Sequence, residues 1–107
     1  MKTIIRASLI VLVVAVVFSN WSVAADTGAD IFKTKCAACH GATGAGDTTM
    51  GKNLKLHDLG SADVQKQSDE ELANIITNGK GKMPKYDGKL TKDQITEVVK
   101  YIRTLKK

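Results

Sequence analysis

Apolar residues recur at helical spacing in three segments of the chain, and none of these segments alternates in the way of a β-strand. In the first segment, Phe32, Cys36 and Cys39 fall on one helical face, and the predicted helix starts at residue 26 or 27 and ends at His40. The pattern therefore predicts an all-α domain with three main helices.

The other two predicted helices carry start signals. The second begins at Ser68, where Glu71 completes a capping box, and it ends at the Asn-Gly pair 78–79. The third begins at Thr91, which has Gln94 in the same relation. Its apolar stripe consists of Ile95, Val98, Val99, Ile102 and Leu105. Three amphipathic helices need a common surface to cover.

A long connection, residues 41–67, separates the first two predicted helices. It contains five glycines, namely Gly41, Gly44, Gly46, Gly51 and Gly60. A connection of this length inside a compact domain is usually functional or wraps a ligand. We expect it to wrap a bound group, with no more than a short helical turn between residues 61 and 67.

The first 25 residues have the layout of a secretory signal peptide. Lys2 and Arg6 form a positive n-region, residues 9–18 form an apolar run, and residues 22–25 form a small-residue cleavage region. We predict cleavage after Ala25, a periplasmic location, and a mature domain over residues 26–107. An uncleaved membrane anchor is the alternative, because no charge interrupts residues 7–25. Ten apolar residues are short for a bilayer, so we expect no stable membrane insertion after cleavage.

The mature chain is small and only mildly basic. Removing 25 of the 107 residues leaves 82, and its aromatic residues are Phe32, Tyr86 and Tyr101. Side chains alone make a thin core at this size, so we expect another group to fill the centre. The loss of Lys2 and Arg6 leaves 14 basic against 11 acidic side chains, a net charge of +3. This balance is too mild to favour binding to nucleic acid.

The segment from Cys36 to His40 holds the candidate chemistry. Two cysteines three residues apart on a helix project to the same side, so both sulfurs can bond to the two vinyl groups of one porphyrin. His40 is then placed to ligate the iron. We predict one haem c, bound covalently through Cys36 and Cys39.

Other sites built on two cysteines fit the sequence less well. A thioredoxin-like redox pair would need a preceding strand and an α/β framework. A zinc site wants four ligands, and only His40 and His57 are present besides the cysteines. A structural disulfide agrees with export but explains neither His40 nor the thin core.

Met83 is the candidate for the second axial ligand. It lies 43 residues after His40, far enough for the chain to return on the opposite face of a haem, and Pro84 fixes the backbone beside it. A thioether is a soft, neutral donor that favours ferrous iron when paired with histidine. His57 and Met50, both in the long connection, are the alternatives. A His57 ligand would give a bis-histidine site of lower potential.

Together these features resemble the class I monohaem c-type cytochromes, the small soluble bacterial-type cytochromes c, over essentially the whole mature chain. The resemblance is carried by Gly28, Phe32, the segment from Cys36 to Gly41, the Met83-Pro84 pair and the helix with Tyr101. It implies the cytochrome c fold, in which the first and last helices cross near Gly28, Phe32 and Tyr101. Many relatives have a loop proline whose carbonyl accepts from the proximal histidine. Residues 51–54 occupy that region here and contain no proline.

This resemblance and the predicted ligands imply a single-electron carrier cycling between ferric and ferrous haem, and not an enzyme. The alternatives are a haem-based ligand sensor or weak peroxidase with a labile distal ligand, and an electron-transfer subunit of a larger oxidoreductase. We expect a monomer whose redox partners have acidic docking surfaces, because lysines flank the predicted ligands. These are Lys33, Lys35, Lys80, Lys82 and Lys85. We assign Arg103, Lys106 and Lys107 to the dipole of the last helix.

Overall fold

The computed structural model describes residues 27–107, so the predicted signal peptide and its cleavage site lie outside the described residues. The elements are α1 (Gly28–Ile31), the π-helix η4 (Phe32–Cys36), α2 (Ala37–His40), α3 (Thr49–Asn53), α4 (Ala62–Gln65), α5 (Asp69–Asn78) and α6 (Lys92–Thr104). Residues 27–107 contain isolated β-bridges but no strand. The all-α prediction is confirmed.

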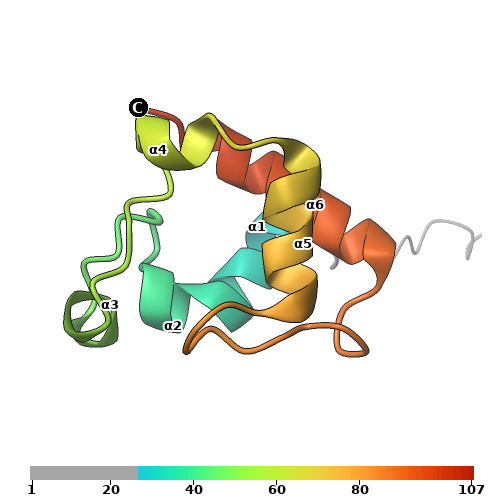
Figure 1. Cartoon of the computed structure of the whole chain (residues 1–107), viewed down its shortest axis with the longest axis horizontal. Coiled ribbons are helices and arrows are strands. Elements are labelled where there is room, and N and C mark those ends of the chain that lie inside the picture. Colours follow the sequence, from blue (N-terminus) through green and yellow to red (C-terminus); the bar gives the residue numbers. More distant parts are fainter. Residues whose placement is uncertain (1–26) are drawn as a thin grey trace, which may run out of the picture.

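The elements are arranged in a ring (Figure 1). In this view α5 and α6 lie on one side with α1 behind them, and α3 lies on the opposite side. The segments α2 and α4 complete the ring between them, and the C-terminus ends beside α4. None of the helices in residues 27–107 has the length and apolar character needed to span a bilayer.

The first predicted helix is present to His40, but it is not a uniform α-helix. Between α1 and α2 it widens to the π-helix η4, in which the N–H of Ala37 bonds to the carbonyl of Phe32. The hydroxyl of Thr34 donates to the carbonyls of Asp30 at 3.0 Å and Ile31 at 3.2 Å. These bonds satisfy backbone groups where the regular helical pattern changes.

Both predicted capping boxes are present. The hydroxyl of Ser68 accepts from the N–H of Glu71 at 3.0 Å, and the carboxylate of Glu71 accepts from the N–H of Ser68 at 2.8 Å. Thr91 and Gln94 repeat this pair of bonds at 3.0 and 2.8 Å. Local side chains therefore determine where α5 and α6 begin.

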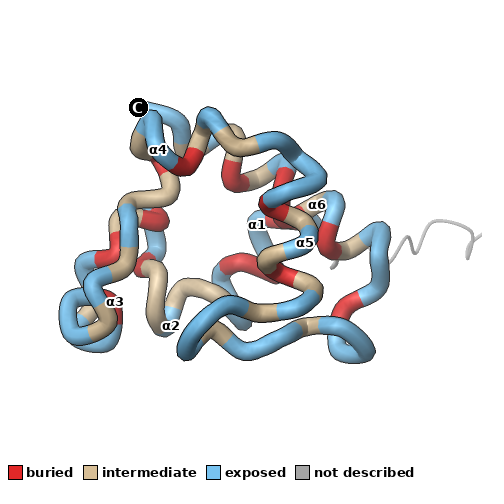
Figure 2. The backbone as a smooth tube through the Cα atoms, viewed as in Figure 1, coloured by how far each residue is buried: buried red, intermediate tan, exposed pale blue. Residues whose placement is uncertain are grey.

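The apolar core lies where α1, α5 and α6 approach one another (Figure 2). Phe32 and Val98 are its most deeply buried side chains. A Cβ atom on Gly28 would lie 2.0 Å from the carbonyl oxygen of Glu97, so α1 and α6 approach closely at this glycine. The ring of Tyr101 packs on Phe32 one helical turn further along α6. The crossing implied by the resemblance is thus confirmed.

The long connection folds back onto the end of α2. The N–H of Gly46 donates to the carbonyl of His40 at 2.7 Å, and the hydroxyl of Thr48 donates to the carbonyl of Cys39 at 2.7 Å. The short helix α4 lies within residues 61–67, as predicted, whereas α3 was not predicted. The connection therefore brackets the Cys-His segment instead of extending away from it.

Candidate haem site

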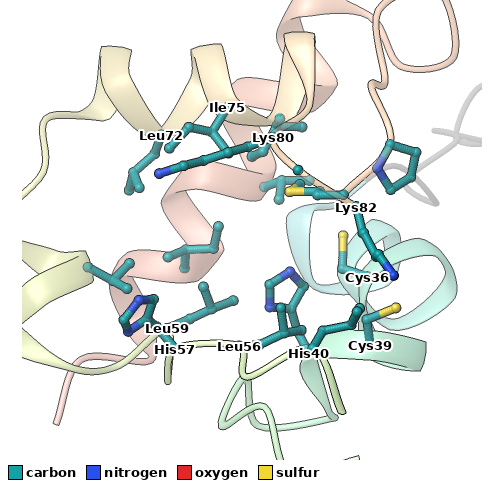
Figure 3. Close-up of a pocket in the computed structure, with 18 of the residues that line it drawn as sticks. Cys36, Cys39, His40, Leu56, His57, Leu59, Leu72, Ile75, Lys80 and Lys82 are labelled. Carbon is teal, nitrogen blue, oxygen red and sulfur yellow. The ribbon is translucent and has the colours of Figure 1, made fainter. Parts of the chain in front are cut away.

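A cavity of about 650 Å³ lies inside the ring of helices. Cys36, Cys39 and His40 line it together (Figure 3). Met83, from a separate part of the chain, lines it as well. Most of the remaining wall is apolar and includes Leu56, Leu59, Val64, Leu72, Ile75, Ile76, Val98 and Ile102. The structure thus brings the four sequence-predicted site residues to one cavity.

The two cysteines lie at the junction of η4 and α2, on one side of the cavity (Figure 3). The two are not joined to each other in a disulfide. Burial raises the pKa of the Cys36 thiol to about 11, against the smaller opposing effect of the Lys35 charge. The thiol is therefore neutral at physiological pH, and its apolar surroundings suit a thioether bond better than a thiolate.

His40 ends α2 with its ring at the cavity. Burial lowers the pKa of His40, which favours the neutral imidazole that ligates metals. Its Nδ1 atom is buried, and none of residues 27–107 accepts a hydrogen bond from it. In many relatives the carbonyl of a loop proline accepts this hydrogen bond. In residues 27–107 no carbonyl accepts it in place of the missing proline.

Met83 lies in a tight turn after α5. Its N–H donates to the carbonyl of Lys80 at 2.9 Å, and the N–H of Lys80 donates back at 3.2 Å. The N–H of Tyr86 ties the following residues to the carbonyl of Ile76 in α5 at 3.0 Å. These bonds hold a flexible methionine at the cavity wall.

The two alternative ligands differ in position. Met50 is half exposed and does not line the cavity. His57 does line it, on the side away from the cysteines, and is itself exposed (Figure 3). The geometry disfavours Met50 and leaves His57 as the competitor of Met83.

The residues present fit a covalently bound haem. Cavities of roughly 300–1,000 Å³ with apolar walls and few polar groups are typical of cofactor sites. This cavity combines such walls with two thiols, an imidazole and a thioether. By contrast, residues 27–107 hold no group of three or more His, Cys, Asp or Glu side chains arranged for a metal ion, as a zinc site would need.

Comparison with known proteins agrees with this fit. A family model described as "Cytochrome C oxidase, cbb3-type, subunit III" matches residues 23–102. Cytochrome c6 of Picosynechococcus sp. (strain ATCC 27264 / PCC 7002 / PR-6) is 35% identical, and the alignment covers 95% of this chain and 92% of that protein. The chain belongs to the c-type cytochromes. Cytochrome c6 of Leptolyngbya boryana is 40% identical to this cytochrome, over 73% of the chain and 88% of the relative.

Solved structures show the same relationship. The KustC0563 c-type cytochrome superposes with a TM-score of 0.71 at 30% identity, covering 76% of this chain and 99% of that one. Cytochrome c6C from Synechococcus sp. PCC 7002 superposes with a TM-score of 0.57 at 35% identity, covering 72% and 90%. The predictions of a class I cytochrome c fold, one covalently bound haem c, and an electron carrier instead of an enzyme are confirmed.

Four polar residues that line the cavity were not predicted from the sequence to belong to the site, namely Asn53, Lys55, Gln67 and Tyr86. The hydroxyl of Tyr86 donates to the carbonyl of Lys35 at 3.1 Å. This bond connects the Met83 side of the cavity to the Cys36 side. In the sequence, Tyr86 stood out as one of three aromatic residues of the mature chain, without a predicted role in the site.

Proposed function

We propose that this cytochrome carries single electrons between exported redox proteins, with its haem attached to Cys36 and Cys39 and ligated by His40 and Met83. The observation that supports this most directly is that all four side chains line one apolar cavity. When bound, the haem supplies reversible one-electron exchange at its iron. The protein contributes the iron ligands, their fixed positions and an apolar environment.

The two residues that would ligate the iron, His40 and Met83, lie on separate, well-anchored elements. His40 is at the end of α2, where the 41–48 segment bonds back to it, and Met83 lies in a turn fastened to α5. Two ligands held in this way change position little when the charge of the site changes. The apolar walls exclude water, and a neutral imidazole with a neutral thioether favours the reduced form.

The axial assignment is tested by comparing Met83→Ala with Met50→Ala and His57→Ala. We expect the parent ferric protein to show the weak far-red band of iron–thioether ligation. Met83→Ala should lose this band and have a lower reduction potential, because a soft donor is removed. Met50→Ala and His57→Ala should retain both. Loss of the parent spectrum in His57→Ala alone would instead identify a bis-histidine site.

The docking surface is proposed to be the cavity mouth. Lys35, Lys80 and Lys82 line the cavity. Lys33 and Lys85 are exposed and lie within three residues of Cys36 and Met83 in the sequence. Lysines around the site of electron exchange would attract an acidic partner and orient it toward the haem. We therefore propose that the redox partner has an acidic docking surface.

Export and state of assembly belong to the same proposal. Cleavage after Ala25 would release residues 26–107 into the periplasm, and the mass of the exported protein tests the cleavage site. We propose that the released domain is a monomer. The matching family model is named for an oxidase subunit, which is the specific reason to test the subunit alternative. Sedimentation of the natively purified protein separates a free carrier from a docked subunit.

A further inference from the structure

One wall of the cavity consists of residues 59–67, and it has little regular structure of its own. Leu59, Val64 and Gln67 from this wall line the cavity, but its only helix is the four-residue α4. At its start, the N–H of Lys107 donates to the carbonyl of Gly60 at 3.0 Å. The other end of this wall, near residues 65–67, is held by different contacts.

That support comes from Arg103 in α6. Its Nη1 donates to the carbonyl of Gln65 at 2.9 Å, and its Nη2 donates to the carbonyl of Gln67 at 2.5 Å. Its Nε donates to the carboxylate of Asp69 at 2.8 Å. No backbone N–H in residues 27–107 bonds to either of these two carbonyls. One planar guanidinium thus satisfies the end of α4 and the start of α5 together.

The side chain of Gln65 completes the same network from the opposite direction. Its Nε2 donates to the carbonyl of Leu59 at 2.8 Å and to the carbonyl of Ile102 at 3.0 Å. Its Oε1 accepts from Nη1 of Arg103 at 3.4 Å. Leu59 and Ile102 both line the cavity, so this polar network lies directly behind an apolar wall.

We infer that Arg103 and Gln65 are positioning residues that hold the 59–67 wall against the haem and keep water from that edge. The inference rests on the proposed function in that the cavity must hold the haem. Arg103 also lies in the last turn of α6, as its assignment to the helix dipole requires. Its contacts add a role that the dipole does not explain, because they depend on the shape of the guanidinium as well as its charge.

The charge and the shape of Arg103 can be separated by substitution. Arg103→Lys keeps the positive charge but removes the fork that reaches two carbonyls and a carboxylate. Gln65→Met removes the network from the other side without changing any charge. Lys100→Gln is the control, because Lys100 lies in the same helix and makes one exposed contact, to Glu97 at 3.3 Å.

Two measurements on the haem-loaded protein test the inference. In Arg103→Lys and Gln65→Met, hydrogen exchange of the amides in residues 61–67 should become about tenfold faster, the factor expected for losing one or two hydrogen bonds. Amides in the middle of α5 and α6 should keep their parent rates. The reduction potential should fall in both variants, because water reaching the haem edge favours the ferric form. Lys100→Gln should match the parent in both measurements.

The opposite results are equally clear. Parent-like exchange and potential in Arg103→Lys would show that charge alone suffices, and equal acceleration across all helices would show a general loss of stability. Either result overturns the inference. If Arg103→Lys does not fold, Gln65→Met decides by the same two measurements. Failure of the proposed function is distinguished beforehand, since the parent would then lack haem or its iron–thioether spectrum.

Discussion

The rings of Phe32 and Tyr101 pack with their centroids 5.2 Å apart and their planes inclined by 48°. Phe32 is 2% exposed and lies one turn before Cys36, so this contact fixes the helix that carries the attachment segment onto α6. Tilted aromatic pairs contribute about 0.5–1.5 kcal/mol beyond their buried area. The haem-attachment segment is therefore held on its core side by this aromatic contact.

Substitution of Gly28 by Ala should weaken this crossing. The new Cβ would lie 2.0 Å from the carbonyl oxygen of Glu97, so the backbones of α1 and α6 must move apart. We expect the free energy of unfolding to fall by roughly 1–3 kcal/mol, as in other overpacked cores. Denaturant unfolding measures this, with Ala29→Ser on the exposed face as control. A change of less than about 0.5 kcal/mol, the usual range for surface substitutions, would contradict the close approach.

A second close approach predicts an effect on the haem site itself. A Cβ on Gly51 would lie 2.6 Å from the carbonyl oxygen of Cys39 and 2.5 Å from that of Gly46. Gly51→Ala should therefore push α3 away from the attachment segment, lowering the yield of haem-loaded protein and its thermal stability. Met50→Ala changes the neighbouring exposed residue and should leave both measurements at the parent level. Equal yields for the two variants would show that α3 does not support the site.

The elements that sequence predicted well are those encoded by neighbouring residues. Ser68 with Glu71, and Thr91 with Gln94, place their hydrogen bonds within four residues, so α5 and α6 were predictable from local chemistry. The π-helix η4 and the helix α3 were not. Gly51 in α3 is placed by contact with Cys39 and Gly46, and no periodic pattern in the connection encodes such a contact.

The site residues likewise fall into two groups, those that the sequence indicates and those that only the tertiary structure reveals. Cys36, Cys39 and His40 form a contiguous motif, and Met83 was identified because a soft donor beside proline suited the same chemistry. The positions of Tyr86 and Gln67 depend instead on contacts between distant segments, such as the bond from Tyr86 to Lys35, 51 residues away in sequence. The cavity walls therefore became visible only with the tertiary structure.

The capping box of α5 predicts a specific dependence of stability on pH. Hydrogen bonds from the backbone and side chain of Ser68 hold the pKa of Glu71 below its usual value of 4.5. The unfolded chain then binds the proton more tightly, so the stabilisation is present above pH 4.5 and is lost as the pH falls through the lower folded value. In Glu71→Gln, the free energy of unfolding should decline less steeply below pH 4.5 than in the parent. Denaturant titrations over this range measure the difference.

Glu70→Gln is the matched control for that experiment. It removes the same charge from the same helical turn but leaves the bonds between Ser68 and Glu71 in place. We expect the parent's acid dependence in this variant. If both variants flatten the curve equally, the effect comes from the net charge of the first turn and not from the capping box.

The lysines at the cavity predict how electron transfer responds to salt. Exposed charges are screened over about 10 Å at 0.1 M ionic strength, so a rate that depends on steering should fall steeply as salt is added. We expect this for electron transfer from the reduced cytochrome to a small acidic copper protein, measured by stopped flow. A triple variant with Lys35→Gln, Lys80→Gln and Lys82→Gln should be at least about tenfold slower at low salt and should lose most of the salt dependence.

A second triple variant distinguishes location from total charge. Lys92→Gln, Lys100→Gln and Lys106→Gln remove the same charge from residues that do not line the cavity. If the cavity mouth is the docking surface, this variant should keep the parent's low-salt rate to within a factor of about two to three and keep its salt dependence, since rim charges act mainly where the partner approaches. Equal slowing in both variants would mean that net charge alone attracts the partner. A rate independent of salt in the parent would exclude electrostatic steering by this face, and electron exchange would then depend on apolar contact around the cavity mouth.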